Sequence, residues 1–427
     1  MQNRHEEHLD IYGDKYILYH GTKKAVYRQG CQDARAKERF AHIKAELAAG
    51  YLDKTLESIS DTNFEDFPPD CQKLILNLVN GITSEVGRAL VGLTILQLTI
   101  KSIEKEQDIR LHKGNTMRGK FSWVDGIAMR SLDQDFNTPF LRKHGLLKLN
   151  NYGVFMTRSL AENYPYSRLY KAEMRGPFSE WIDIVDSIEN ECLNPQLGLS
   201  FILSLLQNRS QKFAQDAQYV CDHVSKLHDF SFSDIKTIIK QFFNDANYSA
   251  RAFEITIHAF MQALSDIGLL EGLVLVPLSQ MRSANKKHGN VGDVELKENS
   301  FIVESWDAKY GKPYLRDELE ELRDKLENNT EVRIAGFICN IEVEQHDVLD
   351  RKEEIATETD TEIVVCSFDE WIEIKTQGID SEVLQKLGYA WVVALVESLA
   401  QRRPSIAPID EPCEAWINDW KTILDGV

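Results

Sequence analysis

The stretch VGDVELKENSFIVESWDAK, residues 291–309, decides the fold. Two segments that mix apolar and charged residues flank the polar turn KENS, a pattern that predicts two neighbouring strands. Asp293 lies on the first strand, and Asp307 and Lys309 lie on the second. Side chains alternate along a strand, so Asp307 and Lys309 share a face. If the strands form a hairpin, Asp293 lies near Asp307, and this trio suits a divalent cation bound beside a phosphate.

The residues around this stretch predict a complete α/β core. Ser249 is a good N-cap for a helix through residues 252–267, and Gly268 or Gly272 can end that helix. Pro313 can open another helix. The apolar side of this second helix comprises Leu315, Leu319, Leu322 and Leu326. Further strands are expected at residues 273–276, 332–339 and 363–366, and further helices at residues 382–400 and 414–424. The order predicts an α/β (α+β) fold with a mixed central sheet flanked by helices.

The rest of the chain is expected to be mainly helical. Residues 32–49, 74–103 and 178–243 carry helical patterning, whereas Gly, Asn, Thr and Ser recur between residues 114 and 158 and indicate loops and short strands. We therefore expect four parts. They are a helical N-terminal region (1–108), a basic loop-rich region (109–177), a helical connector (178–248) and a C-terminal domain that contains the acidic strands (249–427).

Charge is unevenly distributed along the 427 residues. The net charge is −18, which by itself argues against a nucleic-acid partner. Residues 110–176, however, contain twelve Lys or Arg and only five Asp or Glu. Such a basic region can be a footprint for phosphates, and a locally basic solvated surface explains it equally well. Its candidate DNA-binding side chains are Arg118, Lys120, Arg130, Asn137, Arg142, Lys143 and Arg158.

The cysteines and the apolar runs favour a cytoplasmic protein. The seven cysteines are scattered and never form a CxxC pair, which argues against a disulfide framework and a zinc site. The polar first residues lack the apolar core of a signal peptide. The longest apolar run, residues 90–100, is too short to cross a bilayer and predicts a buried helix, so no membrane partner is expected.

The acidic strands resemble the PD-(D/E)xK nuclease superfamily, whose motif is an acid on one strand and acid-x-Lys on the next. The match is Gly292-Asp293 followed by Asp307-Ala308-Lys309, and Gly292 stands where the family has proline. Arg251-Ala252-Phe253-Glu254 is similar to the family's preceding helix, whose acid often completes the metal site. The resemblance covers roughly residues 249–340. A second acid-x-Lys, Glu373-Ile374-Lys375, is rejected because the capping-box pattern of Ser367 to Glu370 places it on a helix.

The resemblance implies a type II restriction endonuclease-like enzyme that hydrolyses double-stranded DNA at specific sequences. Asp293, Asp307 and Glu254 would bind Mg²⁺, and Lys309 would complete the catalytic set. A homodimer is expected, and a cognate DNA methyltransferase is a possible partner in the same system. The basic side chains expected to contact phosphates beside this site are Arg282, Lys286, Lys287, His288 and Lys312.

Two other functions remain open. The chain can be a non-catalytic DNA-binding protein that retains a degenerate nuclease fold. Alternatively, Tyr19-His20-Gly21-Thr22 resembles a short motif of ADP-ribosyltransferases, in which the histidine contacts NAD. No matching Tyr and Glu elements follow that motif, so a turn explains it better.

Overall fold

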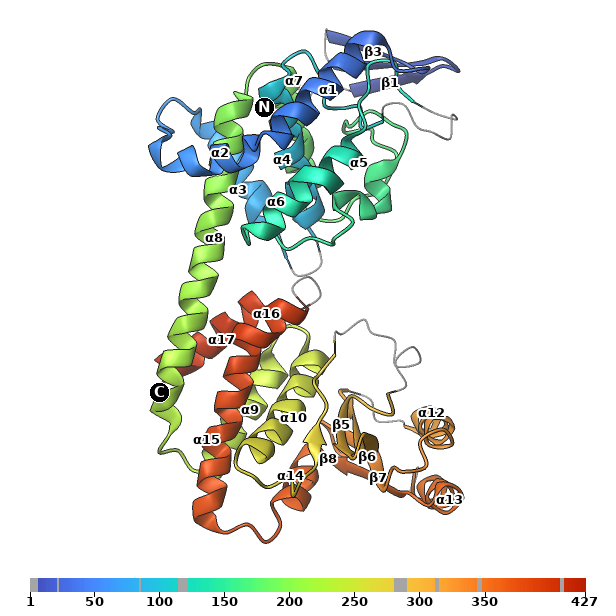
Figure 1. Cartoon of the computed structure of the whole chain (residues 1–427), viewed down its shortest axis with the longest axis vertical. Coiled ribbons are helices and arrows are strands. Elements are labelled where there is room, and N and C mark those ends of the chain that lie inside the picture. The colour runs from blue at the N-terminus through green and yellow to red at the C-terminus, as the bar shows by residue number, and fades with distance from the viewer. Residues whose placement is uncertain are drawn as a thin grey trace. The chain divides into compact units, whose positions relative to one another are not determined.

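The structure is a computed structural model that describes residues 7–20, 23–83, 86–113, 122–279, 290–311, 315–343, 348–407 and 411–427. Its contacts divide the chain into two compact units, Met1–Lys212 and Phe213–Val427 (Figure 1). The fold is mixed α and β, with a three-stranded sheet and a five-stranded sheet. The four-part division expected from the sequence stays a prediction.

The first unit begins with a three-stranded antiparallel sheet that the sequence analysis did not predict. Its strands, in spatial order, are β1 (Glu7–Ile11), β2 (Lys15–His20) and β3 (Lys23–Arg28). Tyr16, Leu18 and Tyr27 are buried and pack with Trp123 in a small apolar cluster. One face of the sheet is therefore buried against this cluster, as is common for an antiparallel sheet.

Helices form the body of the first unit. The longer ones are α1 (Ala34–Ala48), α2 (Tyr51–Glu57), α3 (Pro69–Asn80), α4 (Arg88–Ile103), α7 (Phe178–Glu189) and α8 (Pro195–His223), which contains the boundary between the units. Asp33 caps α1, because its side chain accepts the Ala36 N–H. Every residue of α4 from Leu90 to Ile100 is buried, as predicted for this apolar run.

The basic region differs from the prediction of loops and short strands. It contains α5 (Met129–Leu132), a π-helical turn (Asp133–Asn137), α6 (Thr138–Lys143) and 3-10 turns at Val154–Met156 and Arg158–Ala161. Within described residues 122–177, the β pairing is one isolated bridge, Trp123 to Gln29. The short helices bury one apolar side each, as shown by the buried residues Met129, Leu132, Phe140 and Leu141. Burial of these side chains therefore determined the local structure more than the turn-forming residues did.

The second unit is built on a mixed five-stranded sheet. Its strands in spatial order are β4 (Val274–Leu275), β5 (Val294–Glu298), β6 (Phe301–Lys309), β7 (Ile334–Cys339) and β8 (Glu362–Ser367). The first three pair antiparallel, and β6, β7 and β8 pair in parallel. The predicted mixed sheet, including the hairpin of residues 291–309, is confirmed.

Helices cover both faces of this sheet (Figure 1). One face packs Trp306, Ile338 and Cys366 into a core with α9 (Phe232–Asp245), α10 (Ser249–Asp266), α14 (Phe368–Thr376), α15 (Ser381–Glu397) and α17 (Cys413–Asp425). The other face packs Phe337 and Val365 against α12 (Arg316–Leu326) and α13 (Leu349–Thr359). Between α15 and α17 lie a π-helical turn (Ser398–Arg402) and α16 (Arg403–Ile406).

One expectation about these helices needs correction, and one helix was missed. Ser249 is not the N-cap of α10 but its first residue, because Tyr248 takes the cap position with a φ of 58°. The helix α13 was not predicted, since its one buried residue, Ile355, gives no apolar periodicity. The predicted leucine side of α12 is confirmed. The described helix begins at Arg316, and Pro313, which was expected to open it, lies outside the described residues.

The helical stretch Ser381–Ile406 is long and apolar enough to cross a membrane by length and composition. Half of its apolar window is buried inside the protein, and Trp391 and Leu395 belong to the core of the second unit. Core helices of soluble proteins pass the same test, so this stretch carries no argument for a membrane.

Candidate active site

The hairpin of β5 and β6 brings Asp293 beside Asp307. Val294 pairs with Trp306 across the two strands, which sets Asp293 opposite Asp307. The Asp293 N–H donates to the Trp306 carbonyl at 2.9 Å, and the Asp293 Oδ2 accepts the Ala308 N–H at 3.1 Å. One hydrogen bond therefore fixes the backbone of Asp293, and the other anchors one oxygen of its carboxylate to β6.

Glu254 joins this pair from the first turns of α10. Burial raises the pKa of Asp293 well above its ordinary value, and repulsion from Asp307 and Glu254 raises it further. Burial likewise raises the pKa of Glu254, with Asp307 contributing repulsion and Arg251 opposing it. Three carboxylates thus share one small region from which water is largely excluded. An arrangement of this kind is unfavourable unless protons or a cation compensate the charge.

Lys309 lies in the same cluster. Its Nζ is 2.9 Å from the Asp307 carboxylate and 2.5 Å from the Glu318 Oε2 on α12, and it stands 5.2 Å above the ring of Phe337. Burial disfavours the ammonium, but Asp307 and Glu318 outweigh burial, and the pKa of Lys309 is raised. Lys309 is therefore a fixed positive charge. The sequence analysis missed Glu318, because nothing in the helical pattern distinguishes it from other acidic residues of α12.

Glu254 is hydrogen-bonded to a buried ionic network. Arg251 donates to Glu254 and, through Nε, to Glu411 at 2.9 Å, while Arg403 Nε donates to Glu411 at 2.7 Å. Both arginines also donate to the Ser279 carbonyl. The side chain of Glu411 is fully buried, so two guanidinium groups compensate its charge. Sequence reasoning missed this network because Glu411 lies 160 positions from Arg251.

Glu295 and Gly292 shape the bend that precedes Asp293. Glu295 is buried, and its Oε1 accepts the N–H groups of Val291 at 2.6 Å and Gly292 at 3.3 Å. A Cβ on Gly292 would lie 2.6 Å from the Ser305 Oγ and 2.8 Å from the Trp306 carbonyl oxygen. Gly292 therefore fits where the resembling family has proline, and Glu295 holds the backbone.

The opposite face of β6 carries a separate ion pair. Glu304 accepts hydrogen bonds from the Trp306 Nε1 and the Lys375 Nζ, each at 2.5 Å, and it is buried. Lys375 lies on α14, whose N-terminus has the predicted capping box between Ser367 and Glu370. The rejection of the acid-x-Lys at residues 373–375 is therefore confirmed as far as its helical setting is concerned.

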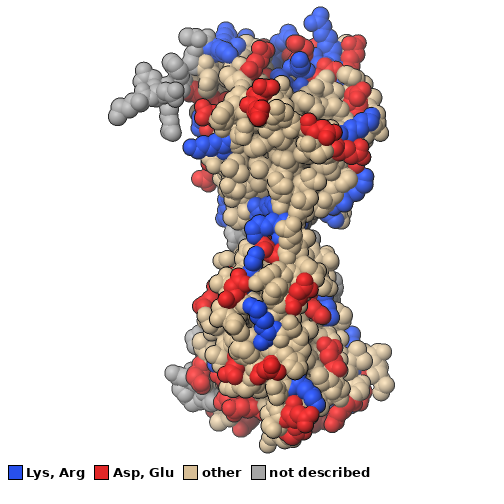
Figure 2. Space-filling model, turned by 90° about the vertical axis from the view of Figure 1, so that its left-hand side faces the viewer, with Lys and Arg blue, Asp and Glu red and all other residues tan. Residues whose placement is uncertain are grey.

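The candidate DNA-binding residues are only partly described. Those that lie outside the described residues are Arg118, Lys120, Arg282, Lys286, Lys287, His288 and Lys312. Arg130, Arg142 and Arg158 are exposed in the first unit, and Lys143 pairs with Asp53 at 2.9 Å. On the face shown in Figure 2, basic and acidic side chains are interspersed over each unit. The structure therefore assigns none of them to DNA.

One member of the basic region must be removed from the candidates. Asn137 is fully buried, and its amide donates to the Gly92 carbonyl at 3.0 Å and to Asp133 at 2.9 Å. Trp123 and Tyr166 are also fully buried. Their polar and aromatic groups stabilise the first unit and have no surface from which to contact a base.

Comparison with known proteins adds no family. No protein-family model matches the chain, and no curated protein matches its sequence. The functional argument therefore depends on the geometry of the site.

Proposed function

We propose that this protein is a Mg²⁺-dependent endonuclease that hydrolyses phosphodiester bonds in double-stranded DNA, with a core of the PD-(D/E)xK type. The observation that carries the proposal is the convergence of Glu254, Asp293, Asp307 and Lys309 from α10 and the β5–β6 hairpin. The order of helix, three strands, helix and strand around that site supports it as well.

The donor set fits Mg²⁺. Carboxylate oxygens are the ligands that this hard cation prefers, and it binds through a small number of them while retaining water. Burial, together with repulsion from Asp307 and Glu254, raises the pKa of Asp293, and a divalent cation would relieve that repulsion. Bound there, Mg²⁺ would polarise a phosphate and lower the pKa of a coordinated water.

Each protein side chain has a defined task in this proposal. Asp293 and Asp307 hold the cation, and the Ala308 N–H keeps Asp293 oriented. Glu254 completes the acidic set, and Arg251 limits its movement. Lys309 keeps its charge and stabilises negative charge that develops on the phosphate, while Glu318 holds the ammonium in place.

The proposed oligomeric state and partners follow from the double-stranded substrate. Cutting both strands needs two active sites, so the enzyme would act as a homodimer. The first unit and the basic residues around the site would read the sequence, and a cognate methyltransferase would protect the host DNA. A genomic neighbour encoding a DNA methyltransferase would support this arrangement.

The test is cleavage of long double-stranded DNA with and without Mg²⁺. We expect discrete Mg²⁺-dependent fragments. Their rate of formation should fall at least about 100-fold in Asp307→Ala and Lys309→Ala, the scale of loss when one group that stabilises transition-state charge is removed. Glu373→Ala is the matched control. It removes the acid of the rejected acid-x-Lys, and Glu373 is an exposed residue of α14. Cleavage should persist in that variant.

The alternatives predict different results. A degenerate DNA-binding protein would bind DNA equally well with and without Mg²⁺, and Asp307→Ala would change nothing. An ADP-ribosyltransferase would consume NAD in a reaction lost in His20→Ala. Absence of cleavage on methylated and unmethylated DNA alike would refute the nuclease proposal.

A further inference from the structure

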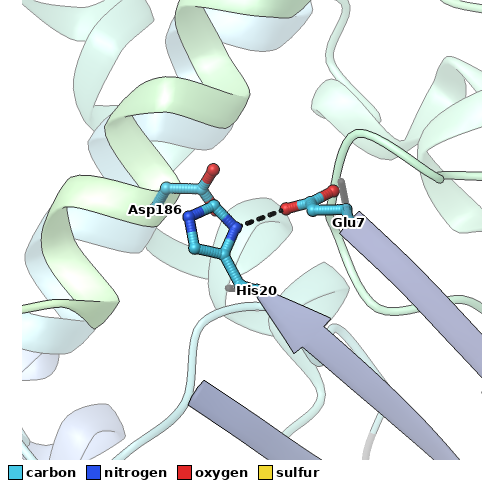
Figure 3. Close-up of side chains that lie close together, drawn as sticks. All are labelled: Glu7, His20 and Asp186. Carbon is cyan, nitrogen blue, oxygen red and sulfur yellow. Dashed lines mark hydrogen bonds and ion pairs between the residues drawn. The ribbon is translucent and has the colours of Figure 1, made fainter. Parts of the chain in front are cut away.

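A second cluster of metal-binding side chains lies in the first unit, separate from the candidate nuclease site. Glu7 on β1, His20 at the end of β2 and Asp186 on α7 face one another (Figure 3). One donor atom from each side chain can be chosen so that all three lie within 4.8 Å of one another. They converge from three elements, and Asp186 is 166 positions away from His20. Chain proximity therefore does not explain their meeting.

The outer atoms of the cluster are held by a second layer of hydrogen bonds. The Glu7 Oε2 accepts the Arg168 N–H at 3.0 Å, and the Glu7 Oε1 bonds the His20 Nδ1 at 3.0 Å. Asp186 Oδ1 accepts from Arg110 at 2.7 Å, and Arg110 is itself fixed by the Tyr166 carbonyl at 2.8 Å. The two nitrogens of an imidazole point away from each other, so an ion bound by both Glu7 and His20 would take the place of the proton between the Glu7 Oε1 and the His20 Nδ1, which lie 3.0 Å apart.

The two carboxylates of the cluster are largely shielded from solvent. The Glu7 and Asp186 side chains expose 4% and 12% of their surfaces, so water screens them poorly. Arg110 offsets the charge of Asp186, whereas among the described residues the Glu7 carboxylate contacts His20 and the Arg168 backbone N–H. Two ligand atoms of one tetrahedral zinc ion, each about 2.1 Å from it, lie about 3.4 Å apart. The three donor atoms lie within 4.8 Å of one another, so side-chain shifts on the order of 1 Å would bring them to that spacing.

We propose that Glu7, His20 and Asp186 form a binding site for a divalent transition metal of the Zn²⁺ class. One imidazole and two carboxylates suit such an ion, and three protein ligands leave a fourth position for water. The His20 side chain is 40% exposed, so that position opens to solvent. The ion ties the β1–β2 hairpin to α7. This proposal is independent of the nuclease function.

The test is Zn²⁺ and Co²⁺ binding to full-length Asp307→Ala protein stripped with chelator, because that substitution weakens the proposed Mg²⁺ site. We expect one saturable Zn²⁺ equivalent by calorimetry and a rise in the melting temperature. With Co²⁺ we expect visible d–d absorption without a thiolate charge-transfer band, which distinguishes the site from the exposed Cys31 and Cys192. Adding His20→Ala should weaken binding by at least about 10- to 100-fold, since even loss of a second-shell partner costs that much.

His8→Ala in the same background is the matched control. His8 is an exposed histidine on β1 that pairs with Asp10, so its loss should leave binding unchanged. Glu7→Gln gives a second, nearly isosteric ligand variant if His20→Ala does not fold, and it should also weaken binding. Absence of saturable Zn²⁺ uptake, or uptake equal in the His20→Ala and His8→Ala proteins, overturns the proposal.

Discussion

Neutralising Asp293 should stabilise the metal-free protein while it destroys the response to Mg²⁺. Asp293→Asn keeps the shape of the side chain and an oxygen to accept the Ala308 N–H, which lies 3.1 Å away. It removes the repulsion from Asp307 and Glu254 that, together with burial, raises the pKa of Asp293. Directly opposed strand residues lie about 5 Å apart, at which two like charges repel by about 3 kcal/mol in an effective dielectric of about 20. Protonation and Arg251 already offset part of this, so we expect a net gain of about 1 to 3 kcal/mol.

Thermal unfolding measures the effect. In chelator, the melting temperature of Asp293→Asn should exceed that of the wild type by about 2 to 4 °C per kcal/mol, for a unit of about 200 residues. Adding Mg²⁺ should stabilise the wild type and leave the variant unchanged, because the variant lacks a ligand. Glu298→Gln is the control: this carboxylate on β5 forms an exposed pair with Arg333, and its loss should cost about 0 to 1 kcal/mol. Equal or lower stability of Asp293→Asn in chelator would refute the reasoning.

Three further predictions concern the fold of the second unit. A Cβ on Gly336 would lie 1.8 Å from the Val364 carbonyl oxygen, so Gly336→Ala should force β7 and β8 apart and cost about 3 kcal/mol or more, measured by chemical denaturation. Lys375→Met leaves buried Glu304 without its cation and should cost about 3 to 5 kcal/mol, an effect that simultaneous Glu304→Gln should partly reverse. Burial lowers the pKa of His258 to about 4, so the stability that it contributes is present above pH 6.5 and lost as pH falls toward 4, by on the order of 3 kcal/mol. Denaturation across that range should show a shallower loss for His258→Gln, and an unchanged slope would contradict the assignment.

The sequence predicted the parts of the second unit whose patterns are local. The leucines of α12 and the alternation in β6 each follow from one element, and the structure confirms both. The N-terminal sheet was missed because its two edge strands are largely exposed: β1 has no buried residue and β3 has one, so apolar alternation does not stand out. The pairing of Arg251 with Glu411 was beyond reach for another reason: one sequence without an alignment gives no sign that residues so far apart are in contact.

Gly292 shows how the structure changes the meaning of a sequence difference. From sequence alone, glycine in place of the family's proline is a tolerable departure, because the acid that follows does the chemistry. In the structure this position donates its N–H to buried Glu295 and has no room for a Cβ. Proline lacks that N–H and carries a Cβ, so it would break the bond and clash with β6. The bend before Asp293 is therefore formed by a glycine and a buried carboxylate. Because the Glu295 carboxylate accepts backbone N–H groups, we infer that it positions Asp293 and does not bind the cation.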